Sequence, residues 1–206
     1  MVNMVRSDRK PRRRLAPGAR RAAILSAAIE AFTTQPYPEV TIATIAASVG
    51  ASNALVYRYF TSKEELYGEV VRLAIAELAD RQAQCLAGLP AGLAARERLK
   101  AVTAIYLDHI ASHPQAWALP LRRPGMEPAA VAELRAQARQ QYVAGLADLL
   151  QPGKHARHDY ALWGYLGFLD VACLRWVDAG CPPDERWPLI EAALGALEGA
   201  LGDWAA

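Results

Sequence analysis

The segment of residues 41–67, TIATIAASVGASNALVYRYFTSKEELY, constrains the fold more than any other part of the chain. Thr41 and Ser52 stand where N-caps would open two short helices, because their hydroxyls can accept hydrogen bonds from backbone N–H groups. Gly50, between the two helices, can adopt the positive φ that a sharp turn requires. Ser62 and the acid three residues later have the spacing of a capping box that opens a third helix. The segment therefore predicts a helix-turn-helix.

Each helix of this motif is predicted to bury one face. In the first, Ile42, Ile45 and Ala46 recur at helical spacing and are expected to lie inward. In the second, Val56 and Phe60 belong to the core on the same argument, while Leu55 could lie in the core or on the surface. The outward positions carry Ser52, Asn53, Tyr57, Arg58 and Tyr59. Such groups on the helix after a glycine turn are typical of units that read DNA in the major groove.

The distribution of charge supports a polyanionic partner. Residues 1–63 contain ten Lys and Arg against three acids, whereas the rest of the chain holds 13 against 18. This asymmetry is expected of a nucleic-acid-binding part attached to a different kind of body. Residues 1–16 are predicted to form a basic, disordered arm that follows phosphates or enters a minor groove, with a solubilising tail as the alternative. The basic residues of this arm are Arg6, Arg9, Lys10, Arg12, Arg13 and Arg14.

Helical periodicity continues through nearly the whole chain, and no alternating strand pattern of useful length appears. Breaks that contain Pro or Gly separate predicted helices over residues 17–34, 62–89, 94–112, 115–121, 128–150, 155–179 and 184–204. We therefore predict an all-α protein. A three-helix DNA-binding head would occupy residues 17–61, and a helical-bundle ligand-binding and dimerisation domain would occupy residues 62–206.

Composition narrows the class of protein further. Apolar residues make up 53% of the chain and charged residues 21%, a globular balance. Cys85, Cys173 and Cys181 lack metal-binding or redox spacing, so reduced thiols in a cytoplasmic protein are expected. No apolar run follows the basic N-terminus, which argues against a secretory signal. The uncharged stretch of residues 40–57 contains Thr, Ser, Asn and a central turn, so it is not expected to span a membrane.

Catalytic and metal-binding interpretations find little support. His109 and His113 are four residues apart, a spacing that could place two imidazoles on one helix face, but no third ligand is evident. His155, His158 and Asp159 cluster at a helix start, where a solvated cap is the simpler role. No G-x-S-x-G, P-loop or dinucleotide glycine fingerprint occurs. We therefore expect no enzyme, no metal and no cofactor.

An ordered set of residues at positions 20–67 resembles the DNA-binding domain of the TetR family of one-component transcriptional regulators. The matching residues are Ile24-Leu25, Ala27-Ala28, Phe32, Thr41, Ile45-Ala46, Val49-Gly50, Tyr57, Phe60 and Ser62-Lys63-Glu64-Glu65-Leu66. The rest of the chain shares only length, helix content and position with the family. The resemblance implies a homodimer with an all-α domain that binds a small-molecule effector.

The predicted helix-turn-helix implies two kinds of DNA contact, one to phosphates and one to bases. Thr41 and Ser52 sit at helix N-termini, which suit phosphates, and the resemblance gives Tyr57 and Lys63 the same role. Tyr59 stands where many relatives carry a histidine that touches the backbone. Base reading is expected from four positions on one helix: Asn53, Ala54, Leu55 and Arg58. Asn can pair with adenine, Arg with guanine, and the apolar pair can meet thymine methyls. Ala43 departs from relatives with a polar reader, so fewer specific hydrogen bonds are available.

The body offers candidates for an apolar effector pocket, with ordinary core packing as the alternative. The candidates are Tyr106, His109, Trp117, Tyr142, Trp163, Phe168 and Asp170. Asp170 interrupts an otherwise uncharged run, where an acid must find a partner. It could bind a cationic or hydroxylated ligand, but pairing with Arg175, Arg139 or a dimer mate is favoured.

The last two predicted helices are joined by a short Pro-Pro turn and are expected to be antiparallel neighbours. Their glycines would permit close helix approach, either within one subunit or in a four-helix dimer interface. These glycines are Gly164, Gly167, Gly195, Gly199 and Gly202. Together these features predict a ligand-responsive, homodimeric regulator, a repressor in the favoured interpretation, that binds a palindromic double-stranded operator. The alternatives are an architectural DNA-binding protein without an effector and a helical enzyme or carrier.

Overall fold

The computed structural model describes residues 16–151 and 155–202, and over these ranges the chain forms nine α-helices and no strand. The all-α prediction is therefore confirmed. The predicted basic arm falls on residues that, apart from residue 16, lie outside the described ranges, as does the end of the last predicted helix.

Three helices build the head: α1 (Pro17–Thr34), α2 (Ile42–Ser48) and α3 (Asn53–Tyr59). The Thr41 hydroxyl accepts a hydrogen bond from the Thr44 N–H at 3.1 Å and opens α2. Gly50 has φ of +61°, as the turn requires, and the Ser52 hydroxyl accepts from the Leu55 N–H at 3.2 Å to open α3. The predicted helix-turn-helix is thus present, with its caps.

The cap of α4 (Lys63–Gly88) differs from the predicted capping box. The Ser62 hydroxyl accepts from the Glu65 N–H at 3.0 Å, as expected. The Glu65 carboxylate, however, accepts from the Thr61 N–H at 2.5 Å and the Thr61 hydroxyl at 2.6 Å instead of from the Ser62 N–H. Thr61 thus supplies two donors to this carboxylate, while the Ser62 hydroxyl accepts from the Glu65 N–H. These bonds from Thr61 hold the pKa of Glu65 below its usual range.

The core of the head extends into α4 and the body. Its buried residues are Ile24, Ala28, Phe32, Val40, Ile42, Ile45, Ala46, Val56, Phe60, Leu66, Tyr67, Val71 and Val131. Leu66, Tyr67 and Val71 come from α4, and Val131 comes from α7 (Ala129–Leu150). Since α4 supplies apolar surface to the head, the predicted boundary at residue 61 separates sequence segments that share a core.

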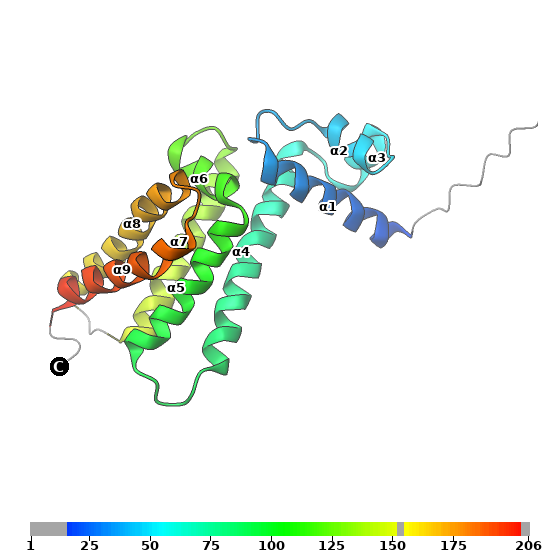
Figure 1. Ribbon diagram of the computed structural model, residues 1–206. Helices are drawn as coiled ribbons and strands as arrows, with labels where there is room; N and C mark the ends of the chain where they lie inside the picture. The colour runs from blue at the N-terminus through cyan, green and yellow to red at the C-terminus, as the bar shows by residue number, and fades with distance from the viewer. Residues whose placement is uncertain (1–15, 152–154, 203–206) are drawn as a thin grey trace, which may run out of the picture.

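The body is a bundle of α4, α5 (Ala95–Ser112), α6 (Pro114–Arg122), α7, α8 (Ala156–Asp178) and α9 (Arg186–Leu201), in which α5 and α7 pack against α4. A single turn of 3₁₀ helix, Pro183–Glu185, precedes α9. Figure 1 shows the head projecting from the first turns of α4, with α8 and α9 on the side of the body away from α4. The two helices pack against each other, as predicted for the C-terminal hairpin.

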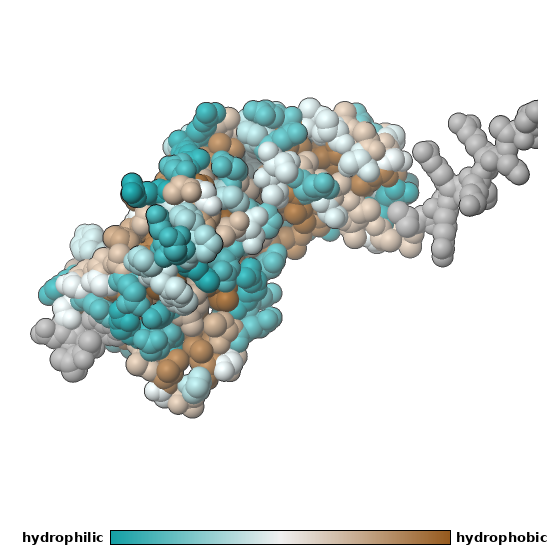
Figure 2. All heavy atoms as spheres, viewed as in Figure 1, coloured by the Kyte–Doolittle hydropathy of each residue, from teal (hydrophilic) through white to brown (hydrophobic). Residues whose placement is uncertain are grey.

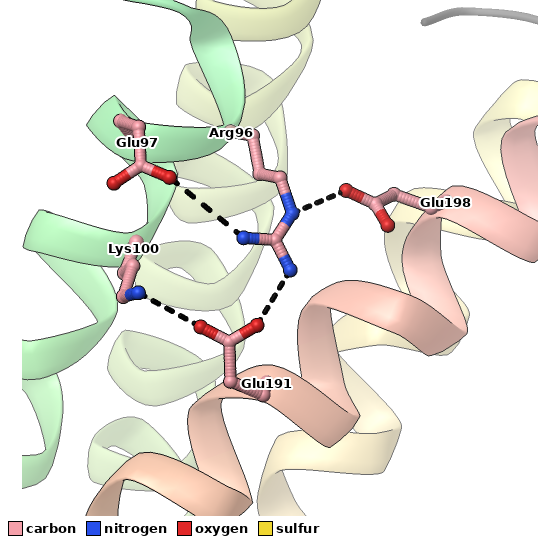
Figure 3. Close-up of polar contacts among 5 residues, drawn as sticks. All are labelled: Arg96, Glu97, Lys100, Glu191 and Glu198. Carbon is pink, nitrogen blue, oxygen red and sulfur yellow. Dashed lines mark hydrogen bonds and ion pairs between the residues drawn. The ribbon is translucent and has the colours of Figure 1, made fainter.

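Charged side chains join α5 to α9 (Figure 3). Arg96 donates to Glu191 at 2.6 Å and to Glu198 at 2.7 Å, and Lys100 contacts Glu191 at 2.8 Å. Hydrogen bonds from Lys100 and Arg96 lower the pKa of Glu191 to about 2. These ion pairs join α9 to α5, and α9 packs against α8.

The surface mixes hydrophilic and hydrophobic residues. Hydrophobic residues gather at the lower tip of the body, where α4 leads into α5 (Figure 2). Throughout the described ranges, no helix combines the length and apolarity that crossing a bilayer would need.

Four of the five glycines in the last two predicted helices lie on outer faces. A Cβ atom added to Gly164, Gly167, Gly195 or Gly199 would meet nothing within 4 Å. The alternative that these glycines serve packing within one subunit is therefore wrong for these four. Gly202 differs, because a Cβ there would lie 3.0 Å from the Arg157 guanidinium.

Candidate DNA-binding surface and effector cavity

The outward face of α3 is fully formed. Ser52, Asn53, Ala54, Tyr57 and Arg58 are exposed, and Tyr57 retains 49% of its accessible surface. This face is held outward because the opposite side of α3 buries Val56 and, just beyond its end, Phe60, in the head core. An exposed polar face on the second helix of such a motif is the geometry that enters a major groove.

Two other predicted contact residues of α3 are less accessible. Leu55 is half-buried, so the sequence ambiguity between core and surface corresponds to an intermediate position. Tyr59 is half-buried against the head core and presents less of its ring to a partner than Tyr57 does.

Lys63 points toward protein carbonyls. Its ammonium donates to the Val40 carbonyl at 2.7 Å and to the Pro38 carbonyl at 3.4 Å, and it lies 4.3 Å from the centre of the Tyr37 ring. Burial lowers the pKa of Lys63 from its ordinary value. The sequence did not reveal these bonds, because the acceptors are backbone atoms more than twenty residues away.

A cavity of about 450 Å³ lies within the body, between α4, α5, α6, α7 and α8. Five of the seven predicted pocket residues line it: Tyr106, His109, Trp117, Tyr142 and Asp170. Its size falls in the range of small-molecule sites. Whether these residues bind a ligand remains a prediction.

The other two predicted pocket residues lie elsewhere. Trp163 is 38% exposed and does not line the cavity. It precedes Asp170 by two helical turns, a spacing that puts the two residues on a similar side of α8. The cavity ends before reaching it. Phe168 packs against the body core, and two residues turn an α-helix by about 200°, away from the direction of Asp170. The spacing in α8 alone could not indicate where the cavity stops.

Polar groups of the cavity wall form a small network. The Trp117 indole N–H donates to the Tyr106 hydroxyl at 3.0 Å, and Arg139 donates to Asp170 Oδ2 at 2.6 Å. Arg139 is thus the partner of Asp170 among the three that the sequence allowed. Two buried atoms, Asp170 Oδ1 and the Tyr142 hydroxyl oxygen, have no hydrogen-bond partner within the described part of the chain.

Burial also sets the ionisation of the wall. It raises the pKa of Tyr106 and of Tyr142 well above the usual value. Burial, followed by the nearby His113, lowers the pKa of His109. These side chains are therefore neutral hydrogen-bonding groups at pH 7.

A second network joins the cavity to the head. Arg135 lines the cavity and donates to both carboxylate oxygens of Glu127 at 3.1 Å. The Tyr67 hydroxyl donates to Glu127 at 3.0 Å, and the Tyr67 ring packs at 4.7 Å from Phe32 and 4.9 Å from Tyr37 between ring centres. One chain of contacts therefore runs from the cavity wall to the aromatic core of the head. Sequence reasoning missed Arg135 and Glu127, which belong to an ordinary-looking charged stretch.

In the described ranges, the His and Cys candidates do not gather with further metal-ligating side chains. The ring centres of His109 and His113 are 6.3 Å apart. Within residues 16–151 and 155–202 there is no group of three or more His, Cys, Asp or Glu suited to a metal ion. Cys85, Cys173 and Cys181 are free thiols.

Comparison with known proteins agrees with the helix-turn-helix head. A family model described as "Bacterial regulatory proteins, tetR family" matches residues 24–70, which contain α2, α3 and most of α1. No curated protein matches the chain in sequence.

Similar solved structures include a tetR-family transcriptional regulator from Streptomyces coelicolor, with 24% identity, TM-score 0.73, and coverage of 90% of this chain and 80% of that one. A transcriptional regulator from Pseudomonas aeruginosa PAO1 has 18% identity, TM-score 0.73, and coverage of 91% and 93%. FadR from Bacillus subtilis, in complex with stearoyl-CoA, has 19% identity, TM-score 0.65, and coverage of 88% and 97%. At these identities the likeness shows a shared fold.

Proposed function

We propose that this chain, whose residues 24–70 match the model of the tetR family of bacterial regulatory proteins, is a ligand-responsive transcriptional repressor. It binds a palindromic operator as a homodimer and leaves the DNA when a small molecule occupies the body cavity. The observation that carries this proposal is the exposed polar face of α3, held outward by the burial of Val56 and Phe60.

In this proposal the exposed residues divide into two groups by role. Asn53 and Arg58 hydrogen-bond to base edges, while Ala54 and the exposed part of Leu55 contact thymine methyls. A second set of groups holds the backbone phosphates: Thr41, Ser52, Tyr57 and Lys63, with Tyr59 in a lesser role. The phosphate contacts set the orientation of the head, and the base contacts select the sequence.

The outer faces of α8 and α9 support the homodimer. Gly164, Gly167, Gly195 and Gly199 leave open backbone there. Large apolar side chains lie exposed on the same helix as the first two glycines, with Tyr160 at 76% and Val171 at 71%. Small residues beside exposed apolar ones suit an isologous pairing in which a second copy packs closely. Two heads on one dimer then match the two half-sites of a palindrome.

Release from the operator follows from elements that touch both the cavity and the head. Helix α4 contributes to the head core and to the cavity wall, and α6 lines the cavity and packs against α1. Arg135 adds a side-chain route through Glu127 to Tyr67. A ligand that prefers one arrangement of these elements shifts the dimer toward a head separation that no longer fits the operator.

The proposed partners are therefore double-stranded DNA, a small-molecule effector and a second copy of the chain. A protein with these partners is proposed to be located in the cytoplasm. Similar structures belong to transcriptional regulators, which supports a non-enzymatic role without a cofactor. The competing proposal is an architectural DNA-binding protein that needs no effector.

Selection of bound duplexes from a random DNA pool, followed by salt titration, tests the proposal. A recovered palindrome bound more tightly than random duplexes, with affinity that falls steeply with salt, is expected. Steep salt dependence without a preferred palindrome would favour the architectural protein, and no DNA binding would exclude both.

Asn53→Ala tests base reading within the same selection. Loss of the amide should change which operator bases are preferred and cost about 1–3 kcal/mol of discrimination at the affected position. Gln35→Ala removes an exposed amide beyond the end of α1 and serves as the control, with an unchanged preference. If Asn53→Ala also left the preference unchanged, Asn53 would not be a base reader.

A further inference from the structure

The cavity wall is divided into a polar and an apolar part. Toward the head, it presents the hydrogen-bonding groups of Tyr106, His109 and Trp117 with the Arg139–Asp170 pair. Toward the opposite end of the bundle, the lining is mainly aliphatic: Leu86, Val102, Leu146 and Leu149, with the Gln82 amide donating to the Val102 carbonyl at 3.2 Å. A molecule that fills both parts has one polar end and one hydrocarbon end.

The cavity extends along the bundle axis. On α4 its lining runs from Ala74 to Leu86, which are separated by about 18 Å at the helical rise of 1.5 Å per residue. On α7 it runs in parallel from Arg135 to Leu149. An unbranched chain of medium length suits this shape better than a compact ring system does.

The charges of the wall are already balanced. Its charged members in the described chain are Arg135, Arg139 and Asp170. Arg135 pairs with Glu127 at 3.1 Å, and Arg139 pairs with Asp170 at 2.6 Å. A charged ligand end would have to break one of these pairs, or stay buried without a counter-charge, and either is costly.

Hydrogen-bonding capacity is not balanced. Asp170 Oδ1 is a buried acceptor without a donor, and the Tyr142 hydroxyl, which belongs to the same wall and lies near the Tyr165 hydroxyl, also lacks a well-formed hydrogen bond. A buried polar group left unpaired costs free energy that a ligand can recover by supplying the missing bond. Asp170 Oδ1 therefore lacks a donor, which a neutral hydroxyl group on a ligand provides after a small adjustment of the Asp170 or Tyr142 side chain.

We propose, building on the function proposed above, that the effector is a neutral amphiphile, a hydroxyl group on a medium-length hydrocarbon chain. The hydroxyl donates to Asp170 Oδ1 and accepts from the Tyr142 hydroxyl. The chain lies among the aliphatic side chains between α4, α5 and α7. Asp170 thereby selects a hydroxyl over a carboxylate, because its own charge already occupies Arg139.

Calorimetric titration of the full chain with four matched probes tests this inference. The probes are decanol, decyl methyl ether, decanoic acid and decylamine, which share a tail and differ in the polar end. Decanol should bind at least about tenfold more tightly than the ether, because only decanol donates a hydrogen bond to a carboxylate. Both charged probes should bind more weakly than decanol.

Asp170→Asn should reverse the preference. Without the carboxylate, decanol should lose about tenfold in affinity, while decanoic acid should gain because Arg139 is free to pair with it. Tyr142→Phe should weaken decanol and its ether alike, because the oxygen of either probe can accept from the Tyr142 hydroxyl. Asp178→Asn is the matched control, since Asp178 lies on the same helix and pairs with Arg122 outside the cavity wall. Circular dichroism confirms that each variant is folded.

Equal affinity for decanol and its ether would overturn the inference, and so would tighter binding of either charged probe to the unaltered chain. DNA release is measured separately on the selected operator. Release by some other compound, with no decanol binding, would overturn the inference and leave the proposed function intact. Decanol binding without release would support the ligand chemistry and count against the proposed function.

Discussion

At the scale of single residues, Lys63 shows how one charge can serve two purposes. Its ammonium ties the start of α4 to the segment before α2 through the carbonyls of Val40 and Pro38. An ammonium has three donors, so one remains to meet a phosphate at the helix N-terminus. Folding of the head and binding of DNA are thus both expected to depend on this side chain.

Lys63→Ala is expected to lower the stability of the protein by about 1 kcal/mol, since a charge-assisted hydrogen bond is lost at a partly exposed site. It should also weaken DNA binding similarly for all sequences. The slope of log affinity against log salt concentration should become shallower by about one. Thermal melts and salt titrations measure the two effects. Lys100→Ala, which removes a lysine from the body, should leave the salt slope unchanged. A destabilised Lys63→Ala protein with an unaltered slope would limit Lys63 to its structural role.

Sequence reasoning at this scale succeeded where a residue's surroundings are local. Helical spacing assigned Val56 and Phe60 to the core, and an acid in an apolar run indicated that Asp170 must be paired. It failed where partners come from distant segments. The backbone acceptors of Lys63 and the position of Trp163 beyond the cavity depend on how helices pack, which no local pattern contains.

At the scale of elements, the helix boundaries were predicted to within a few residues because caps and breaks are local. Pro and Gly mark most ends, and Ser or Thr hydroxyls mark the starts of α2, α3 and α4. The capping box predicted the Ser62 N–H as the donor to the Glu65 carboxylate, and this was wrong, because spacing cannot show which nearby donor is better placed. Contacts between elements, such as the ion pairs of Figure 3, were not predicted.

The pairing of α5 with α9 predicts a pH dependence. The pKa of Glu191 is about 2 in the folded protein, against an ordinary value of 4.5. A lowered pKa means that the ionised carboxylate stabilises the fold above pH 4.5, and that this stabilisation is lost as the pH falls toward 2. The melting temperature of the protein should therefore exceed that of Glu191→Gln at pH 6, and the difference should shrink between pH 4.5 and pH 2.

Glu133→Gln provides the control for this titration. Glu133 lies on an exposed part of α7 and contacts only Gln137 among the hydrogen bonds described for it. Its melting curve should follow that of the unaltered protein across the same pH range. A difference for Glu191→Gln that stays constant with pH would mean that the ion pairs do not stabilise the fold.

At the scale of the whole molecule, the proposed dimer depends on open backbone at the outer faces of α8 and α9. Gly195→Leu should be tolerated by the single chain, because a Cβ there meets nothing within 4 Å and a helix interior favours Leu over Gly. In the dimer the larger side chain would hold the subunits apart. Light scattering should show a shift toward monomer, and affinity for the palindrome should fall because two heads no longer bind together.

Ala136→Leu adds similar bulk to an exposed position of α7 and should leave the dimer intact. A dimer of unchanged stability in Gly195→Leu would place the subunit interface elsewhere. The sequence could suggest a glycine-rich interface but could not exclude packing within one chain. That distinction required the three-dimensional arrangement of α8 and α9.

Helix α8 has two sides with different neighbours. Leu166 and Asp170 face the cavity, while Gly164 and Gly167 lie on an outer face. A ligand that moves Asp170 would therefore act on a helix whose other side meets the second subunit in the proposed dimer. Under such linkage each binding event changes the other by the same factor, so subunit pairing and ligand affinity would be reciprocal. The protein would then sense its own concentration as well as that of its effector.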